Sequence, residues 1–275
     1  MKNSTCILLL AMAVCSVGKA QQKSFAPVKS GSEIQPFLFS VNTLTQGASF
    51  WNFNYSGSYG ESVSGPFGYN GVDQHFALKG YFGNRFTLYA NLGLGLENGG
   101  SLRSAQQAEV IRDFFGGKKL LGPRLGLGIG VSRDYTNVKS LFSRITGSLD
   151  ALNWRLTGNL RLEKAFDSNR DEIDLVTSAG FHHRIAGGFF AGVEAVGEDL
   201  EGFWDKEEAE GGARLLIGPS LNLVPENSRL AFSLCGGPVF YATRSIVPAS
   251  GAIRELQSAN NGYIVRAQVA FSLHN

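Results

Sequence analysis

The sequence GYIVRAQVAFSLHN, residues 262–275, decides the fold class of this chain. Apolar and polar side chains alternate along it: Tyr263, Val265, Ala267, Val269, Phe271 and Leu273 share one parity, and Arg266, Gln268, Ser272 and His274 the other. Because successive side chains of a β-strand point to opposite faces, one face suits lipid and the other water. The stretch is also long enough to cross a bilayer as a tilted strand. It predicts the last strand of a transmembrane β-barrel of a bacterial outer membrane.

The same alternation recurs along most of the chain. It predicts strands within residues 51–59, 75–82, 85–97, 124–131, 141–150, 154–163, 172–184, 189–198, 213–223 and 230–235. With the terminal strand these make eleven. Residues 37–43, in which Phe37, Phe39 and Val41 share a face, are a candidate for a twelfth strand. The pattern predicts an all-β, antiparallel, up-and-down barrel.

Connection lengths leave two strand numbers open, twelve and ten. Barrels of this kind have an even number of strands, short periplasmic turns and longer outer loops. Twelve strands include residues 37–43 and 124–131, place the turn Gly83–Asn84 outside, and leave residues 98–123 in the periplasm or the lumen. Ten strands omit both segments and make that turn periplasmic. We favour twelve, because residues 124–131 alternate too regularly to be discarded.

Residues 104–115, SAQQAEVIRDFF, lack the two-residue period. Ala108, Ile111 and Phe115 would share one stripe of a helix, which Ser104 could cap and the following glycines could stop. We expect a short helix here. It would pack beside a turn or, alternatively, form a plug or constriction inside the barrel.

The amino-terminal residues have the three parts of a secretory signal: Lys2, an apolar run over residues 6–17, and a small-x-small site ending at Ala20. We expect a cleaved Sec-type signal peptide at 1–20, a flexible leader at 21–34 and the barrel at 35–275. A lipoprotein with Cys15 as the lipidated residue is a weaker alternative. After cleavage Cys235 is the only cysteine, so no intramolecular disulfide is expected.

Composition excludes other classes of protein. The chain is 43% hydrophobic, with a mean hydropathy of −0.03, and beyond the signal it has no apolar run long enough for a spanning helix. A barrel needs only half of each strand to be apolar. The net charge of +2 gives no electrostatic reason to expect nucleic acid as a partner.

The polar parity of the predicted strands carries more cations than acids. The candidate lumen charges are Lys79, Arg85, Arg144, Arg155, Arg161, Glu163, Asp174, Arg184, Glu194, Glu198, Arg214 and Arg266. These charges are expected inside, because a lysine or arginine facing lipid at mid-depth costs ~2–4 kcal/mol. They could form a salt-bridge network that closes a narrow barrel, or an arginine-rich eyelet that favours anions.

The sequence gives no pattern for catalysis, a cofactor or a metal. His182 shares a face with Asp174 and Ser178, but four residues of one strand span ~13 Å, too far for hydrogen bonds between them. Residues 194–210 are rich in carboxylates but lack the spacing of a calcium loop. We therefore expect no enzyme, no cofactor and no metal site.

The signal peptide, the alternating strands and the aromatic terminal strand together resemble bacterial outer-membrane β-barrel proteins of the small porin-like class. Phe271 is followed by four residues rather than being last, which departs from the usual assembly signal. The resemblance implies a Gram-negative outer-membrane location, with membrane lipid and the barrel assembly machinery as partners. It implies a passive pore for small polar or anionic solutes, or alternatively a closed structural or adhesion barrel that presents outer loops.

Overall fold

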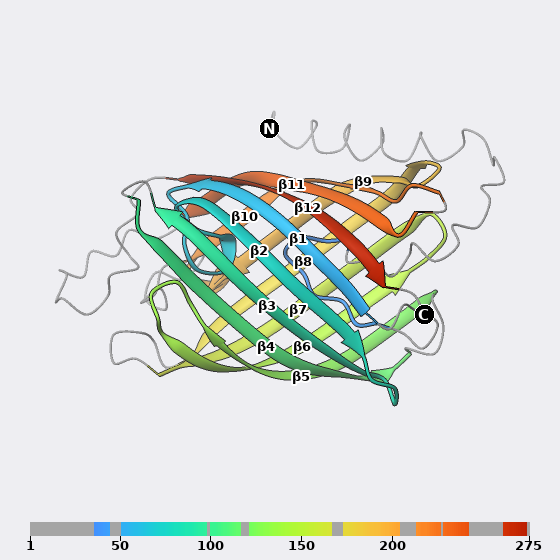
Figure 1. Ribbon diagram of the computed structural model, residues 1–275, viewed down its shortest axis with the longest axis horizontal. Helices are drawn as coiled ribbons and strands as arrows, with labels where there is room; N and C mark the ends of the chain where they lie inside the picture. Colours follow the sequence, from blue (N-terminus) through green and yellow to red (C-terminus); the bar gives the residue numbers. More distant parts are fainter. Residues whose placement is uncertain are drawn as a thin grey trace, which may run out of the picture.

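The computed structural model describes residues 36–44, 51–97, 100–116, 121–166, 173–203, 213–226, 228–241 and 261–273. Twelve antiparallel strands in this part of the chain form one closed barrel (Figure 1). They are β1 Trp51–Glu61, β2 Gly71–Tyr81, β3 Phe86–Glu97, β4 Leu102–Phe115, β5 Gly122–Arg133, β6 Lys139–Asp150, β7 Trp154–Ala165, β8 Asp174–Ala186, β9 Phe189–Glu198, β10 Arg214–Leu223, β11 Leu230–Tyr241 and β12 Gly262–Leu273. Each strand pairs with its neighbour in sequence, and β1 pairs with β12. The predicted twelve-stranded, up-and-down barrel is confirmed.

The two ends of the barrel differ in their connections. The short-turn end carries residues 82–85, 116–121, 151–153, 187–188 and 224–229, and the long-loop end carries the other connections. The β8–β9 hairpin needs only two residues because Gly187 takes a φ of +49°, which glycine adopts without strain. In bacterial barrels the short turns face the periplasm.

The segment predicted as a helix, residues 104–115, is instead most of strand β4. It pairs with β3 and β5 along its length. The period-two signal is missing because the outer face carries polar or small side chains, including Gln106 and Arg112, while the apolar Ile111 faces inward and is fully buried. Hydrogen bonding to two neighbouring strands overrides the local helical pattern.

The missed strand also explains an error in the predicted topology. The twelve-strand version placed Gly83–Asn84 at the outer end, but this turn lies at the short-turn end together with residues 151–153. One unrecognised strand moves every earlier connection to the opposite end. The turn is tight, since Gly83, Asn84 and Arg85 have φ values of 82°, 48° and 66°.

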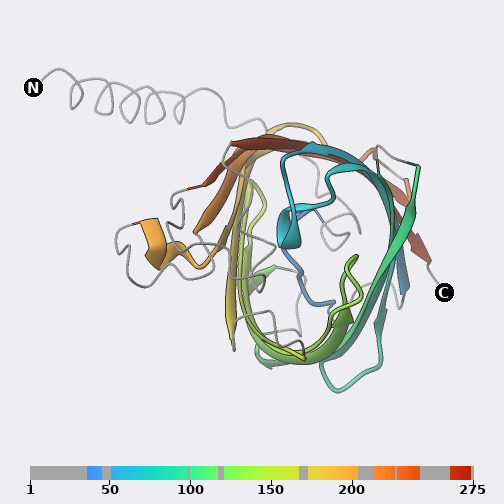
Figure 2. The same cartoon turned by 90° about the vertical axis from the view of Figure 1, so that its left-hand side faces the viewer.

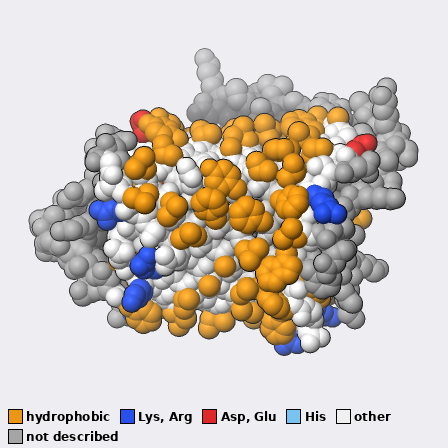
Figure 3. Space-filling view, viewed as in Figure 1, with side chains coloured by type: hydrophobic (Ala, Val, Ile, Leu, Met, Phe, Trp, Pro, Cys, Tyr) orange, Lys and Arg blue, Asp and Glu red, His pale blue; other side chains and the backbone are white. Residues whose placement is uncertain are grey.

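Exposed apolar side chains cover the middle of the barrel face seen in Figure 3, and charged ones lie nearer its ends. Leu92, Leu160 and Val193, on the apolar parity of their strands, are 38%, 46% and 50% exposed on the outside of the barrel. Glu194, adjacent to Val193, is fully buried on the inner side. None of the helices among the described residues is long and apolar enough to span a bilayer.

Residues 36–44, here called the strap, contain the segment 37–43 that was a candidate for the twelfth strand. That prediction is wrong, because the strap is not one of the barrel strands. Its residues lie inside the ring of strands (blue in Figure 2), and seven of the nine are buried. Every strand of the closed sheet already has two partners, so the strap has no edge to join. The predicted signal peptide and leader lie outside the described residues.

Candidate functional site

Both ends of the strap contact the barrel wall near the short-turn end. The Ser233 hydroxyl, early in β11, donates to the carbonyl of Pro36 at 3.2 Å. The amide of Leu44 donates to the Thr87 hydroxyl, early in β3, at 3.0 Å. Since β3 and β11 both begin at the short-turn end, Pro36 and Leu44, the two ends of the strap, both lie near that end of the barrel.

The middle of the strap rises to mid-depth. The Glu194 carboxylate of β9 accepts the amides of Leu38 and Phe39 at 2.8 and 2.9 Å. The Asn159 side chain of β7 accepts the amide of Val41 at 2.7 Å and donates to its carbonyl at 3.0 Å. The strap is thus a U-shaped insert whose backbone polar groups are bound by wall side chains.

Charged side chains of the wall near the short-turn end bind Asn42 and Thr43, in the second half of the strap. Lys79 donates to the backbone carbonyl and the side-chain oxygen of Asn42 at 2.8 and 2.7 Å. Arg124 donates to the carbonyl of Thr43 at 3.1 Å, and Asp113 accepts the Thr43 hydroxyl at 2.9 Å. Charges at this end of the lumen therefore hold the strap.

The connection between β1 and β2 folds into the lumen from the long-loop end. It contains the short helix η3 Gly65–Phe67, drawn inside the barrel in Figure 2. Phe67 is fully buried against apolar side chains of the inner wall, namely Val196, Leu216, Val239 and Ile264. This packing fixes the loop over one side of the lumen.

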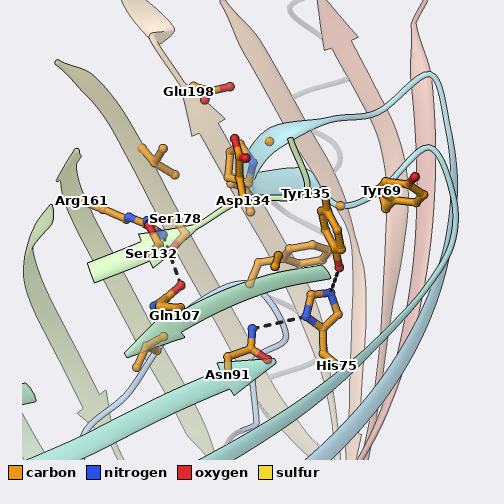
Figure 4. Close-up of a pocket in the computed structure, with 18 of the residues that line it drawn as sticks. Tyr69, His75, Asn91, Gln107, Ser132, Asp134, Tyr135, Arg161, Ser178 and Glu198 are labelled. Carbon is orange, nitrogen blue, oxygen red and sulfur yellow. Dashed lines mark hydrogen bonds between the residues drawn. The ribbon is translucent and has the colours of Figure 1, made fainter. Parts of the chain in front are cut away.

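A cavity of about 390 Å³ remains between this loop and the strap, with strap residues 38–41 among its lining (Figure 4). The Figure 4 view shows polar side chains from separate strands converging on it, among them Asn91, Gln107, Ser132, Arg161 and Ser178. The cavity is therefore a vestibule above the strap, lined by both polar and apolar side chains.

Aromatic rings line one side of the vestibule. Tyr69 and Tyr135 have ring centroids 4.8 Å apart. His75 lies beneath them, with Nε2 3.4 Å from the Tyr135 hydroxyl and Nδ1 3.3 Å from the Asn91 amide (Figure 4). Burial raises the pKa of the Tyr135 phenol above its usual value, so it stays protonated at neutral pH.

Three of the predicted lumen cations, Arg144, Arg161 and Arg266, reach this vestibule. Arg144 pairs with Glu109 at 2.9 Å, and Glu109 is almost fully buried. Arg161 pairs with Glu163 at 2.6 Å. The Arg266 guanidinium lies 4.6 Å from the centre of the Phe39 ring on the strap. The arginines are therefore held in place at mid-depth, just above the strap.

Other predicted lumen charges lie on the inner wall but away from the vestibule. Arg155 is almost fully buried, 3.9 Å from the centre of the Phe190 ring, and donates to Asn222 at 2.9 Å. Arg184 lies over the same ring at 5.1 Å. These two arginines pack the short-turn half of the lumen.

Near the long-loop end, Arg214 forms an ion pair with Glu198, and Asp174 lies at the start of β8 and lines the vestibule. Arg85 is the exception among the predicted lumen charges. It belongs to the turn before β3 and donates to the carbonyl of Phe114 at 3.0 Å, so it is not on the inner face of a strand.

Four inner-wall acids were missing from the predicted set: Asp73, Glu109, Asp113 and Asp150. Glu109 and Asp113 belong to β4, so the helical interpretation hid them. Asp150 pairs with Arg124, which was also left out. A count along the strands that the sequence did predict would have found only Arg124 and Asp150. The four acids largely cancel the positive excess that the sequence argument assigned to the lumen.

His182 does meet a serine and an acid, but not Ser178 and Asp174. Ser220 of β10 donates to Glu194 at 2.5 Å and lies 2.8 Å from Nε2 of His182. In a hydrolytic triad the acid holds the histidine, whereas here the serine lies between the two. All three side chains are fully buried, and Glu194 also binds the strap amides. The trio supports the strap.

No group of three or more histidine, cysteine, aspartate or glutamate side chains suited to a metal ion occurs among the described residues. Residues 204–210 of the carboxylate-rich segment 194–210 lie outside them.

Comparison with solved structures finds outer-membrane porins. The chain is similar to the NanC porin, with a TM-score of 0.55 and 8% identity over 80% of this chain and 100% of that one. It is similar to the KdgM porin, with a TM-score of 0.53 and 10% identity over 81% and 99% of the two chains. A second KdgM structure, in complex with disordered oligogalacturonate, gives 0.52 and 11%. The chain has the porin fold. No protein-family model and no curated protein sequence matches it.

Proposed function

We propose that this protein is an outer-membrane barrel whose lumen is a passive pathway for small polar solutes, anions in particular. The observation that carries the proposal is the vestibule of about 390 Å³, with Arg144, Arg161 and Arg266 gathered deep inside it. Several acids of the vestibule, such as Asp174 and Glu198, lie at the ends of their strands, near the mouth of the lumen at the long-loop end. A solute that passes the mouth then meets guanidinium groups that attract anions.

Selectivity in a salt gradient tests the proposal. The reversal potential of the wild-type channel should show a preference for anions over cations. Arg161→Gln should reduce that preference and Arg161→Glu should move it toward cations, with smaller shifts at high ionic strength. Arg112→Gln is the matched control, because Arg112 lies on the outer face over the Phe86 and Phe114 rings. A wild-type channel that prefers cations would contradict the proposal.

The strap supports a second candidate, a closed structural barrel that presents loops. Its backbone is bound in the short-turn half of the lumen, where Lys79, Asp113 and Arg124 hold it. If purified, folded protein never conducts in a planar bilayer, this candidate replaces the pore. Neither candidate requires a catalytic group.

A further inference from the structure

We propose that the strap, residues 36–44, is a displaceable plug that gates the pore. The proposal rests on the pore function above and specifies how it is controlled. In the structure the strap occupies the lumen from the short-turn end to mid-depth, directly below the vestibule. A solute in the vestibule can continue through the barrel only if the strap moves.

The wall is shaped to bind an extended peptide in this place. Side chains from nine strands bind the strap by hydrogen bonds: Lys79, Thr87, Asp113, Arg124, Thr146, Asn159, Ser178, Glu194 and Ser233. Most of these bonds go to backbone groups of the strap. The closed position is therefore a specific bound state of this segment.

The same contacts allow the strap to leave. They are mainly polar, and water can replace polar partners when a lumen floods, whereas it cannot replace apolar packing. Both ends of the strap lie at the short-turn end, so the U-shaped segment can withdraw to that side without threading past a strand. By contrast, the loop around Phe67 is anchored in an apolar cluster and should stay in place.

One apolar anchor of the strap offers a way to loosen it. The Phe37 ring stacks on His182, with centroids 4.3 Å apart, and covers Gly180 of β8. A Cβ added at Gly180 would come within 2.4 Å of the Phe37 ring. Gly180→Ala should therefore push Phe37 from its site and raise the open probability several-fold. Gly147→Ala is the matched control, since its Cβ would meet nothing within 4 Å.

A reversible lock gives the decisive experiment. The Ser40 and Ser178 hydroxyl oxygens lie 3.0 Å apart, so cysteines there fall within reach of a disulfide, whose Cβ atoms are about 3.5–4.5 Å apart. In a Cys235→Ala background, the pair Ser40→Cys and Ser178→Cys ties the strap to β8. The control pair, Asn52→Cys and Ser272→Cys, joins β1 to β12 at partnered positions and leaves the strap untied.

Single-channel currents of both pairs, oxidised and then reduced in the same bilayer, separate the outcomes. We expect oxidation of the strap pair to lower the open probability at least tenfold, with recovery on reduction, and the control pair to show no redox response. Equal conduction with the strap locked and released would overturn the gate and leave the pore standing. If Gly180→Ala and the reduced strap pair are silent although heat-modifiable migration on gels shows that they are folded, both the pore and its gate are wrong.

Discussion

Leu160 and Arg161 are neighbours on β7 but belong to opposite environments. Leu160 is 46% exposed on the outer face, and Arg161 turns into the vestibule and pairs with Glu163. A cation on a lipid-facing strand position costs ~2–4 kcal/mol at the bilayer midplane, and a leucine in a polar lumen costs less. The side of the wall therefore decides what each position tolerates.

We predict that Leu160→Arg lowers the yield of folded barrel much more than Arg161→Leu. The measurement is the fraction of heat-modifiable protein after refolding into lipid vesicles. Equal losses from the two substitutions would mean that the assignment of inner and outer faces is wrong.

Among the single elements, strand β4 shows which kind of strand the sequence pattern fails to predict. Eleven strands have a lipid-facing row that is mainly apolar, so periodicity finds them. On β4 the outward Gln106 and Arg112 and the inward Ile111 reverse the pattern. Only its pairing with β3 and β5 identifies it as a strand, and pairing between strands is not visible in local periodicity.

The strap shows the opposite error, since it was predicted to be a strand and is not one. Phe37, Phe39 and Val41 alternate like a strand, yet the backbone groups around them bind wall side chains instead of a neighbouring strand. Arg144, Arg161 and Arg266 could be predicted because they lie on the polar face of strands that alternate regularly. Their partner Glu109 and the support of Glu194 for the strap could not, since both follow from contacts between distant strands.

A proline in β4 tests its assignment. Ala108 pairs with Ala90 of β3 and Val131 of β5. Ala108→Pro should abolish or strongly reduce barrel formation, because proline removes a ladder hydrogen bond from a central strand. Ala108→Val should fold normally, since a β-branched apolar residue suits a lipid-facing strand position. Normal folding of the proline variant, judged by heat-modifiable migration, would count against a strand here.

The orientation of the barrel in the membrane can be tested by labelling its loops. Asp205 lies between β9 and β10, in a connection of the long-loop end. We predict that Asp205→Cys reacts with an impermeant thiol reagent on intact cells. Leu152→Cys, in the exposed turn between β6 and β7, should react only after the outer membrane is permeabilised. The reverse labelling pattern would invert the topology.

At the scale of the whole molecule, the barrel consists of an apolar outer wall, a vestibule lined by four arginines, Arg133 among them, and a strap beneath it. The positive excess expected from the sequence is mostly neutralised by acids such as Asp73 and Asp150. Anion preference then depends on where the arginines lie more than on the sum of charge, so we expect it to be weak.

Current through single molecules of the wild-type protein in a planar bilayer tests the central claim most directly. The claim is that the vestibule continues into a path across the membrane, closed in the described structure by residues 36–44. We predict discrete, brief openings from a silent baseline, and longer openings in Gly180→Ala. Folded protein that stays silent in both forms would contradict the claim and leave a closed barrel.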